Sequence, residues 1–482
     1  MELYAIQLEL MLALLGVVAL LTDAFLPRLD PRRFGFILAA AVAGILVYSF
    51  WLTPAVTPAC SGMIRTDAFA LFFMRLFLLV AVLVLVLVAH DFEVLQRDAA
   101  AFCAMILFAA TGMMFMAASN DFFMLFVALE LVTVSFYVLT SFLRRSNASL
   151  EAGVKYLTLG TLASSFLVFG IAFVFGGTGS TNFEALAALP AAARDHNVAF
   201  LFGGMLVLAG LGFKIACAPF QMWAPDVYQG APTPAAAFLA TGSKAAGFAV
   251  LIRLFLSGVL PMKEQWAGLL ALAAIASMLY GSLGAIAQRD VKRLMGYSSI
   301  AHAGFLLMGL GAFNDLGLGA LLYYLVQYAV SVICAFLVFV AVHQATGSWD
   351  MVRLAGLHKR SPLLALALFL AMMSLAGIPP LSGALGKFFL FGAALQRGAS
   401  DWHFIALAVV AAVAVVISLY YYLGVVRAAF VDPSPDDTRP IPLTRTLYVT
   451  LVACMAAMVL LGLFPHPLLR ASLETVRTLA IR

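Results

Sequence analysis

Residues 212–244 read GFKIACAPFQMWAPDVYQGAPTPAAAFLATGSK. Two apolar segments meet here around a proline-rich stretch, and each contains a lysine, Lys214 or Lys244. Both lysines lie 15 residues from Gln229, so an antiparallel helical hairpin would bring their ammonium groups to a similar depth. A charged side chain within a bilayer is costly and usually faces a polar interior path. The stretch therefore predicts a helical membrane protein with a charged interior.

The whole chain has the composition of a membrane protein. Of its 482 residues, 64% are hydrophobic and 11% are charged, whereas soluble domains carry roughly 25% charged residues. Apolar runs of about 20 residues suit helices and not barrel strands. We therefore expect an all-α integral membrane protein with about fourteen transmembrane helices. These are expected at residues 5–25, 34–52, 68–89, 100–117, 121–142, 152–175, 198–218, 234–258, 267–286, 293–312, 317–342, 361–396, 403–429 and 446–464.

The loops differ in basic residues, which orient a membrane protein because Lys and Arg are retained on the cytoplasmic side. One set of alternate loops is rich in them: Arg28, Arg32, Arg33, Arg97, Arg144, Arg145, Arg289, Lys292, Arg293, Arg353, Lys359, Arg360, Arg427, Arg439 and Arg445. The other set, with the C-terminal tail, holds Arg65, Arg194, Lys263, Arg397, Arg470, Arg477 and Arg482. This distribution predicts a bacterial inner-membrane protein with both termini on the periplasmic side. No basic segment precedes the first apolar run, so we expect a spanning helix there and not a cleaved signal peptide.

Two expected helices contain prolines within the span. Pro219 lies in the seventh, and Pro379 and Pro380 lie in the twelfth. Proline removes a backbone donor and clashes with the preceding turn, so helices 7 and 12 should be broken. Breaks five helices apart predict two inverted five-helix repeats, because an odd number of helices per unit reverses its orientation. The expected parts are helices 1–3 (1–99), helices 4–8 (100–258), helices 9–13 (259–430), and helix 14 with the tail (431–482).

Several charged or titratable residues fall inside the expected helices. They are Glu130, Lys155, Lys214, Lys244, His302 and Lys387, together with Arg75 and Arg253. A lysine can release its proton in a low-dielectric interior, whereas arginine stays charged, so a row of lysines favours a proton path. Glu130 could pair with Lys214, or exchange that partner for Lys155, and thereby control when the lysine is charged. No nucleophile–base pair, phosphate loop or metal cluster accompanies these charges in the sequence, which favours ion translocation over bond-making chemistry.

Each of these residues also has a structural interpretation. Glu130 and Lys214 could form a static pair that fixes helix packing. Lys155 and Lys387 could extend to the membrane interface, and His302 could be a hydrogen-bonded packing residue and not a proton relay. Arg75 and Arg253 we interpret as snorkelling or lipid-contact residues.

The run Gly212–Tyr228 resembles the proton-antiporter-type membrane subunits of respiratory complex I, the bacterial NADH:quinone oxidoreductase or NDH-1. Its continuation through Gly230–Lys244 narrows the resemblance to the N-subunit branch of that family. Further matches are Leu129–Glu130–Leu131, Glu151–Tyr156, Tyr297–His302, and Ala376–Gly383 with Lys387. The resemblance covers about residues 120–460.

The resemblance implies a proton-translocating subunit of a translocase, in which partner subunits oxidise NADH and reduce quinone. It implies an input pair of Glu130 and Lys214, a central Lys244 and an output-side Lys387. NADH, FMN, iron–sulfur clusters and quinone would belong to partner subunits, with no cofactor or metal in this chain. The expected partners are the lipid bilayer and other complex I membrane subunits, including neighbouring antiporter-like ones, and not nucleic acid. A subunit of a multisubunit cation/proton antiporter, which would share the same charges, and a non-pumping scaffold are the alternatives.

Overall fold

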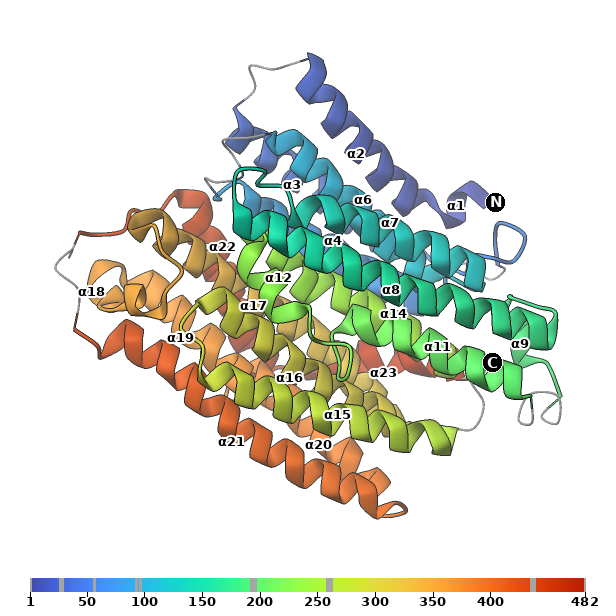
Figure 1. Ribbon diagram of the computed structural model, residues 1–482. Coiled ribbons are helices and arrows are strands. Elements are labelled where there is room, and N and C mark those ends of the chain that lie inside the picture. The colour runs from blue at the N-terminus through green and yellow to red at the C-terminus, as the bar shows by residue number, and fades with distance from the viewer. Residues whose placement is uncertain are drawn as a thin grey trace.

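The computed structural model describes residues 2–25, 30–54, 58–91, 94, 98–190, 197–256, 263–433 and 439–480. Within these residues the long helices lie roughly parallel in one bundle, and both chain ends lie at the same end of it (Figure 1). Four of the loop arginines counted above, Arg28, Arg97, Arg194 and Arg482, lie outside the described residues, as does the side chain of Lys263.

Twelve helices in the described part of the chain are long and apolar enough to cross a membrane. The shorter apolar stretch in α2 (Gln7–Phe25) and the interrupted pair α19 (Pro362–Ala376) and α20 (Ser382–Gly398) account for the other two expected spans. The prediction of an all-α membrane fold with about fourteen spans is therefore confirmed. The remaining spans are α3 (Pro31–Ser49), α4 (Ala68–Val88), α6 (Ala99–Ala118), α7 (Phe122–Thr140), α8 (Asn147–Thr178), α11 (Val198–Ile215), the continuous α13 (Thr233–Phe238), η1 (Leu239–Ser243) and α14 (Lys244–Leu256), α15 (Lys263–Ile286), α16 (Val291–Gly311), α17 (Asp315–Thr346), α21 (Trp402–Phe430) and α22 (Arg445–Leu463).

Short helices connect or extend these spans. They are α1 (Glu2–Ala5), α9 (Phe183–Ala187), α12 (Ala224–Gly230), η2 (Met351–Leu354), α18 (Leu357–Arg360) and the C-terminal α23 (His466–Ala480). The sequence analysis treated residues 466–480 as a tail, but they form a helix that packs against α17 and α4. Ser472, Val476 and Leu479 are buried at helical spacing, whereas Arg470 and Arg477 are exposed. Helix α23 is therefore amphipathic and covers the bundle with one face.

Three spans form the centre of the bundle. The most apolar window is 100% buried in the span Thr233–Leu256 and 94% buried in both α16 and α17, against 33–50% in α7, α8, α15, α21 and α22. Helix α17 packs against α4, α16, α19, α20, α22 and α23. A helix surrounded by protein on all sides can hold charged side chains away from lipid. The central spans carry Lys244, His302 and several tyrosines, so the fold places these groups in the interior.

The backbone is interrupted at three places within the spans. Helix α11 ends at Ile215, and Ala216 takes the left-handed conformation before the irregular stretch that leads to α12. Helix α19 ends at Ala376, where Gly377 has φ +91° and a glycine avoids the steric cost of that conformation. These two breaks confirm the prediction for helices 7 and 12. The third interruption, the π-helical η1 directly before Lys244, has no proline in it and was not predicted.

Two distant parts of the chain share the same end structure. Helices α8 and α17 each contain 32 residues and each end in Thr-Gly-Ser, at 178–180 and 346–348, with the glycine in the left-handed conformation. Asn182 and Asp350 then cap a short helix. Each also forms an isolated antiparallel bridge, Asn182 with Asp121 before α7, and Asp350 with Asp290 before α16.

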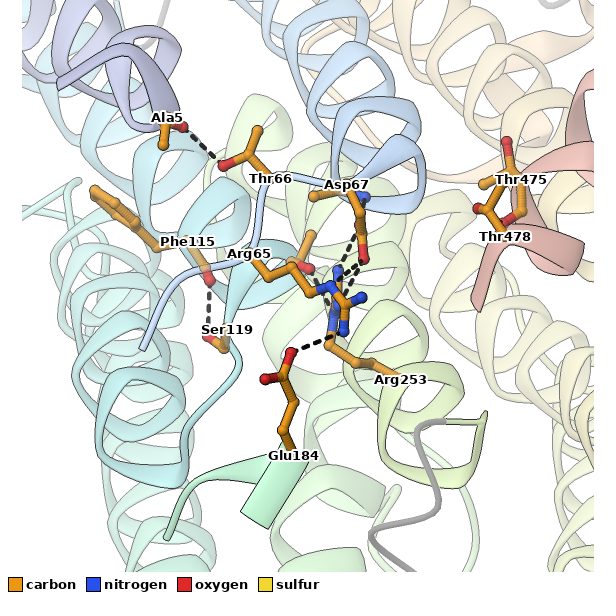
Figure 2. Close-up of polar contacts among 12 residues, drawn as sticks. Ala5, Arg65, Thr66, Asp67, Phe115, Ser119, Glu184, Arg253, Thr475 and Thr478 are labelled. Atoms are coloured by element: carbon orange, nitrogen blue, oxygen red, sulfur yellow. Dashed lines mark hydrogen bonds and ion pairs between the residues drawn. The ribbon is translucent and has the colours of Figure 1, made fainter. Parts of the chain in front are cut away.

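A cluster of charges lies where α14 ends, and it corrects the interpretation of Arg253 as a lipid-contact residue. Arg253 is 2% exposed and donates from both Nη atoms to the carboxylate of Asp67, at 3.0 and 2.9 Å, and from Nε to the carbonyl of Ala117 at 3.0 Å. Figure 2 shows Arg65 approaching the same carboxylate, at 3.6 Å, while it also bonds Glu184 of α9 at 3.1 Å. The cluster ties α14 to α4, α6 and α9. Arg75 is half-buried and donates to the carbonyl of Ser49 at 2.9 Å.

Replacing Arg253 with methionine should therefore destabilise the protein strongly. Removing one partner of a buried ion pair typically costs about 3–5 kcal/mol, because the other charge is left unpaired. Thermal unfolding of the purified assembly would measure the loss, with Arg75→Met as the control that removes a half-buried arginine. Adding Asp67→Asn to Arg253→Met should restore part of the stability. Equal unfolding temperatures for the two single variants would contradict this account.

Candidate functional site: a buried row of charged residues

Glu130 and Lys214 lie on neighbouring helices but do not form the direct pair that the sequence analysis considered. Lys214 is buried in the last turn of α11 and donates from Nζ to Oγ1 of Thr133 at 2.7 Å. Glu130 is half-buried on α7, and its Oε1 accepts from Oγ of Ser164 at 2.6 Å. No ion pair within 4 Å joins the two residues in the described part of the chain. Because Thr133 lies one turn from Glu130, the hydroxyl connects the lysine to the same stretch of α7.

Lys155 belongs to a separate surface cluster and does not contact Glu130 within ion-pair distance. Its Nζ lies 2.6 Å from Oδ2 of Asp226 and 2.7 Å from Oε1 of Glu151, and its side chain is 40% exposed. The other Asp226 oxygen accepts from Nη1 of Arg293 at 2.6 Å. Asp226 on α12 thus joins α8 to α16. Burial alone would raise the pKa of Asp226, but the hydrogen bonds from Lys155 and Arg293 outweigh it and hold the pKa below its ordinary value.

Lys244 is the first residue after the π-helical segment and points at α16. It is 1% exposed, and its Nζ donates to the carbonyl oxygen of Ser299 and to the Ser299 Oγ, the latter at 2.6 Å. The same Oγ lies 3.2 Å from the hydroxyl of Tyr228. Lys214 lies close by, since a Cβ built on Gly247, one turn after Lys244, would be 3.7 Å from the Cβ of Lys214. Lys214 of α11 therefore packs against α14 one turn from Lys244.

His302 lies at the centre of a hydroxyl network. Its Nδ1 is 2.6 Å from the hydroxyl of Tyr324 on α17, and its Nε2 is 2.9 Å from the hydroxyl of Tyr422 on α21. Tyr422 also bonds Oγ of Ser298. The Tyr328 ring lies 4.9 Å from the His302 ring and 5.8 Å from Nζ of Lys244, and the Phe305 ring lies 6.2 Å from the His302 ring and 4.8 Å from Nζ of Lys387. The network thus occupies the space between these two lysines.

Lys387 bonds the broken end of α19. Its Nζ donates to the carbonyls of Leu375 and Ala376, both at 2.9 Å, and its aliphatic chain lies against Gly377. Because α19 ends there, these carbonyls have no partner within the helix. The ammonium group also lies 4.8 Å from the centre of the Phe305 ring. Lys387 is 4% exposed, so it does not extend to the membrane interface.

The structure also buries ionisable residues that the sequence analysis did not select, Lys292 and Glu9 among them. Lys292, counted above among the loop charges, is 4% exposed and donates to the carbonyl of Ala231 at 2.6 Å, with Nζ 4.8 Å from the centre of the Trp349 ring. Glu9 on α2 is fully buried, and neither carboxyl oxygen has a hydrogen-bond partner in the described residues. Both residues lie in the first turn of a helix, α2 or α16. Charged residues are often exposed there, so the sequence alone did not indicate that they are buried.

The arrangement has the elements that proton transfer needs. Lys214, Lys244 and Lys387 are amines buried in protein, and hydroxyl groups and one imidazole lie between the last two. Each of the three lysines lies beside one backbone interruption, where carbonyl groups or altered helix geometry are available. Such groups can accept and release protons without breaking any other covalent bond.

The chain is similar to known proteins over nearly its full length. Residues 119–418 match the family described as NADH:quinone oxidoreductase/Mrp antiporter, TM. NADH-quinone oxidoreductase subunit N of Moorella thermoacetica is 35% identical over 99% of both chains, and that of Heliobacterium modesticaldum is 38% identical over 98% of both. A chain of respiratory complex I from Thermus thermophilus matches with a TM-score of 0.78 and 33% identity over 96% of this chain and 98% of that one. A chain of the Mrp complex from Dietzia sp. DQ12-45-1b shares the fold, with a TM-score of 0.82 at 24% identity over 100% and 98% of the two chains.

Replacing Asp226 with asparagine should lower stability at neutral pH, by about 1 kcal/mol or less because the cluster is partly exposed. The lowered pKa means that the carboxylate contributes fully above pH of about 4, near the ordinary aspartate value, and that this contribution is lost as the pH falls further. Unfolding temperatures of wild type and variant should therefore differ at pH 7 and converge in acid. A constant difference across that range would contradict the assignment. Glu151→Gln, which leaves the Arg293 contact intact, is the control.

Proposed function

The chain belongs to the NADH:quinone oxidoreductase/Mrp antiporter family, and within it to the NADH-quinone oxidoreductase N subunits, and we propose that it is the proton-translocating N subunit of such a complex. Partner subunits would oxidise NADH and reduce quinone, and they would hold NADH, FMN, iron–sulfur clusters and quinone. The chain would contribute no redox group of its own and would act as a subunit of a translocase.

The observation that carries this proposal is the buried row itself. Lys214 packs against α14 one turn from Lys244, and His302 with Tyr324 and Tyr422 lies between Lys244 and Lys387. Tyr324 also packs directly on Gly386, the neighbour of Lys387, because a Cβ there would be 2.7 Å from the tyrosine ring. Glu130 would modulate Lys214 across Thr133, and Lys155 would act from the surface cluster through Asp226 and α8. In this scheme protons pass along the row because the charge on each lysine changes the proton affinity of the next group.

The orientation and the internal repeats are part of the proposal. We place both termini on the periplasmic side of a bacterial inner membrane, which the excess of Lys and Arg in the opposite loops supports. We assign helices 4–8 and 9–13 to two inverted repeats, over residues 100–258 and 259–430. The paired ends of α8 and α17 and the paired breaks at Ala216 and Gly377 support this division.

The outer surface supports membership in a larger membrane assembly. Around Glu130, the side chains of Val127, Val134 and Leu131 are 60%, 53% and 37% exposed on α7. This face is apolar and must be covered by lipid or by another membrane subunit. A cation/proton antiporter subunit is the second candidate, favoured by the shared fold of the Mrp chain. Proton pumping that requires NADH and ceases with a quinone-site inhibitor would favour the NADH:quinone oxidoreductase subunit over the antiporter subunit.

Lys214→Ala and Glu130→Ala test whether the charges pump or only hold helices together. We expect assembly to be largely kept, because Lys214 makes one hydroxyl contact and Glu130 another, while pumping and coupled quinone reduction fall. Proton uptake by membrane vesicles, normalised to assembled complex, measures this. Unaltered pumping in both variants would overturn the proposal, whereas failed assembly with normal pumping per complex would favour the scaffold.

Lys244→Arg separates charge from proton transfer. Arginine keeps the positive charge beside Ser299 but does not deprotonate in proteins. Pumping should therefore fall by about 100-fold, the low end of what general acid–base groups contribute, while the complex remains assembled. Lys359→Arg, in a basic loop outside the row, is the control. A variant that pumps at the wild-type rate would show that Lys244 serves only as a fixed charge.

A further inference from the structure

A groove opens on the side of the bundle that carries the basic loops. It has a volume of about 680 Å³ and lies between the end of α15, η2 and the last turns of α21. Arg289, Asp350, Arg427 and Asp432 line its outer part, and Arg427 bonds Asp432 at 3.1 Å. The charged rim shows that this part of the groove is compatible with water. The scheme above does not use it.

Tyr421 lines the inner part of the same groove. The residue is 3% exposed, and its hydroxyl is buried without a hydrogen-bond partner among the described residues. A buried hydroxyl without a partner is costly, and a water in the groove is the simplest group that could satisfy it. Its neighbour Tyr420 also lines the groove, but it is 69% exposed.

Tyr421 also contacts the hydroxyl network. Its ring centre lies 4.4 Å from that of Tyr422, whose hydroxyl bonds Oγ of Ser298. Tyr422 in turn lies 2.9 Å from Nε2 of His302. Tyr421 is thus the residue where a water-compatible groove meets the buried row.

We propose that this groove and Tyr421 form a proton entrance from the cytoplasm to His302, an inference that rests on the proposed function. A hydronium ion in the groove gives one proton to the oxygen of Tyr421. The Tyr421 hydroxyl then turns toward Tyr422, against which its ring packs, and releases its own proton to the oxygen of Tyr422. Tyr422 passes its proton to Nε2 of neutral His302. Both tyrosines end unchanged, the groove retains a water, and the imidazole gains one proton that it can deliver toward Lys244 or Lys387.

Gly424 offers an independent way to test the groove. It lines the groove one turn after Tyr420, and a Cβ built on it meets no atom within 4 Å. A leucine there would place its side chain in the groove, and its Cβ would meet no neighbouring atom. Gly44 on α3 has the same open surroundings and lies far from the groove in the sequence, so Gly44→Leu is the matched control.

The experiment compares Tyr421→Phe with Tyr420→Phe in the assembled complex in membrane vesicles. Each removes one hydroxyl oxygen from adjacent residues. Tyr421→Phe should slow NADH-driven proton uptake about tenfold and raise the solvent deuterium isotope effect, because proton entry becomes rate-limiting. Tyr420→Phe should behave as wild type. Gly424→Leu should slow uptake as Tyr421→Phe does, and Gly44→Leu should not.

The outcomes separate this inference from the proposed function. Wild-type uptake and isotope effect in Tyr421→Phe would overturn the entrance, whatever Gly424→Leu does. Equal losses in Tyr421→Phe and Tyr420→Phe would also overturn it, because only Tyr421 is buried and packed against Tyr422. Normal pumping in the lysine variants would instead refute the proposed function. Loss in the lysine variants with no loss in Tyr421→Phe would refute the entrance alone.

Discussion

Carbonyl groups at a helix break and a lysine ammonium satisfy each other inside this protein. Where α19 stops at Ala376, its last carbonyls would face a medium that offers no donor, and each would cost several kcal/mol. Lys387 donates to two of them. At the first break, a side chain also satisfies a carbonyl near the helix end: the indole N–H of Trp223 donates to the carbonyl of Phe213. At the second break, Lys387 and the interrupted backbone therefore depend on each other for hydrogen bonds in the membrane interior.

The spans Thr233–Leu256, α16 and α17 lie at the centre of the bundle, next to these hydrogen bonds. These spans are enclosed by other helices, so the lysines and tyrosines on them avoid lipid without reaching an interface. Lys155, by contrast, lies on the less buried α8 and is stabilised by carboxylates at the surface. The difference between the two environments follows from which helices surround each residue.

The sequence predicted those features that local chemistry determines. Apolar runs gave the spans, and prolines gave the breaks at Ala216 and Gly377, because both effects act within a few residues. The π-helical turn before Lys244 was missed, since nothing local requires it. Arg253 was misassigned because its partner, Asp67, is distant in the chain and becomes visible only when α4 and α14 pack together. Lys292 looked like a loop charge for the same reason, and the contact of Glu130 with Ser164 depends on how α7 meets α8.

The cluster at Arg253 also limits how the central lysine can move. Lys244 is the first residue of α14 and Arg253 is near its end, so about 14 Å of rigid helix separates them. One end of this rod is fixed to α4 and α6 by the guanidinium group of Arg253. The rod cannot slide along its axis without breaking that anchor, so displacement of the ammonium group is left to its own four-carbon chain and to the wider turn of η1. Lys244 thus lies at the end of α14 that adjoins the π-helical turn, and the other end of α14 is held in place by Arg253.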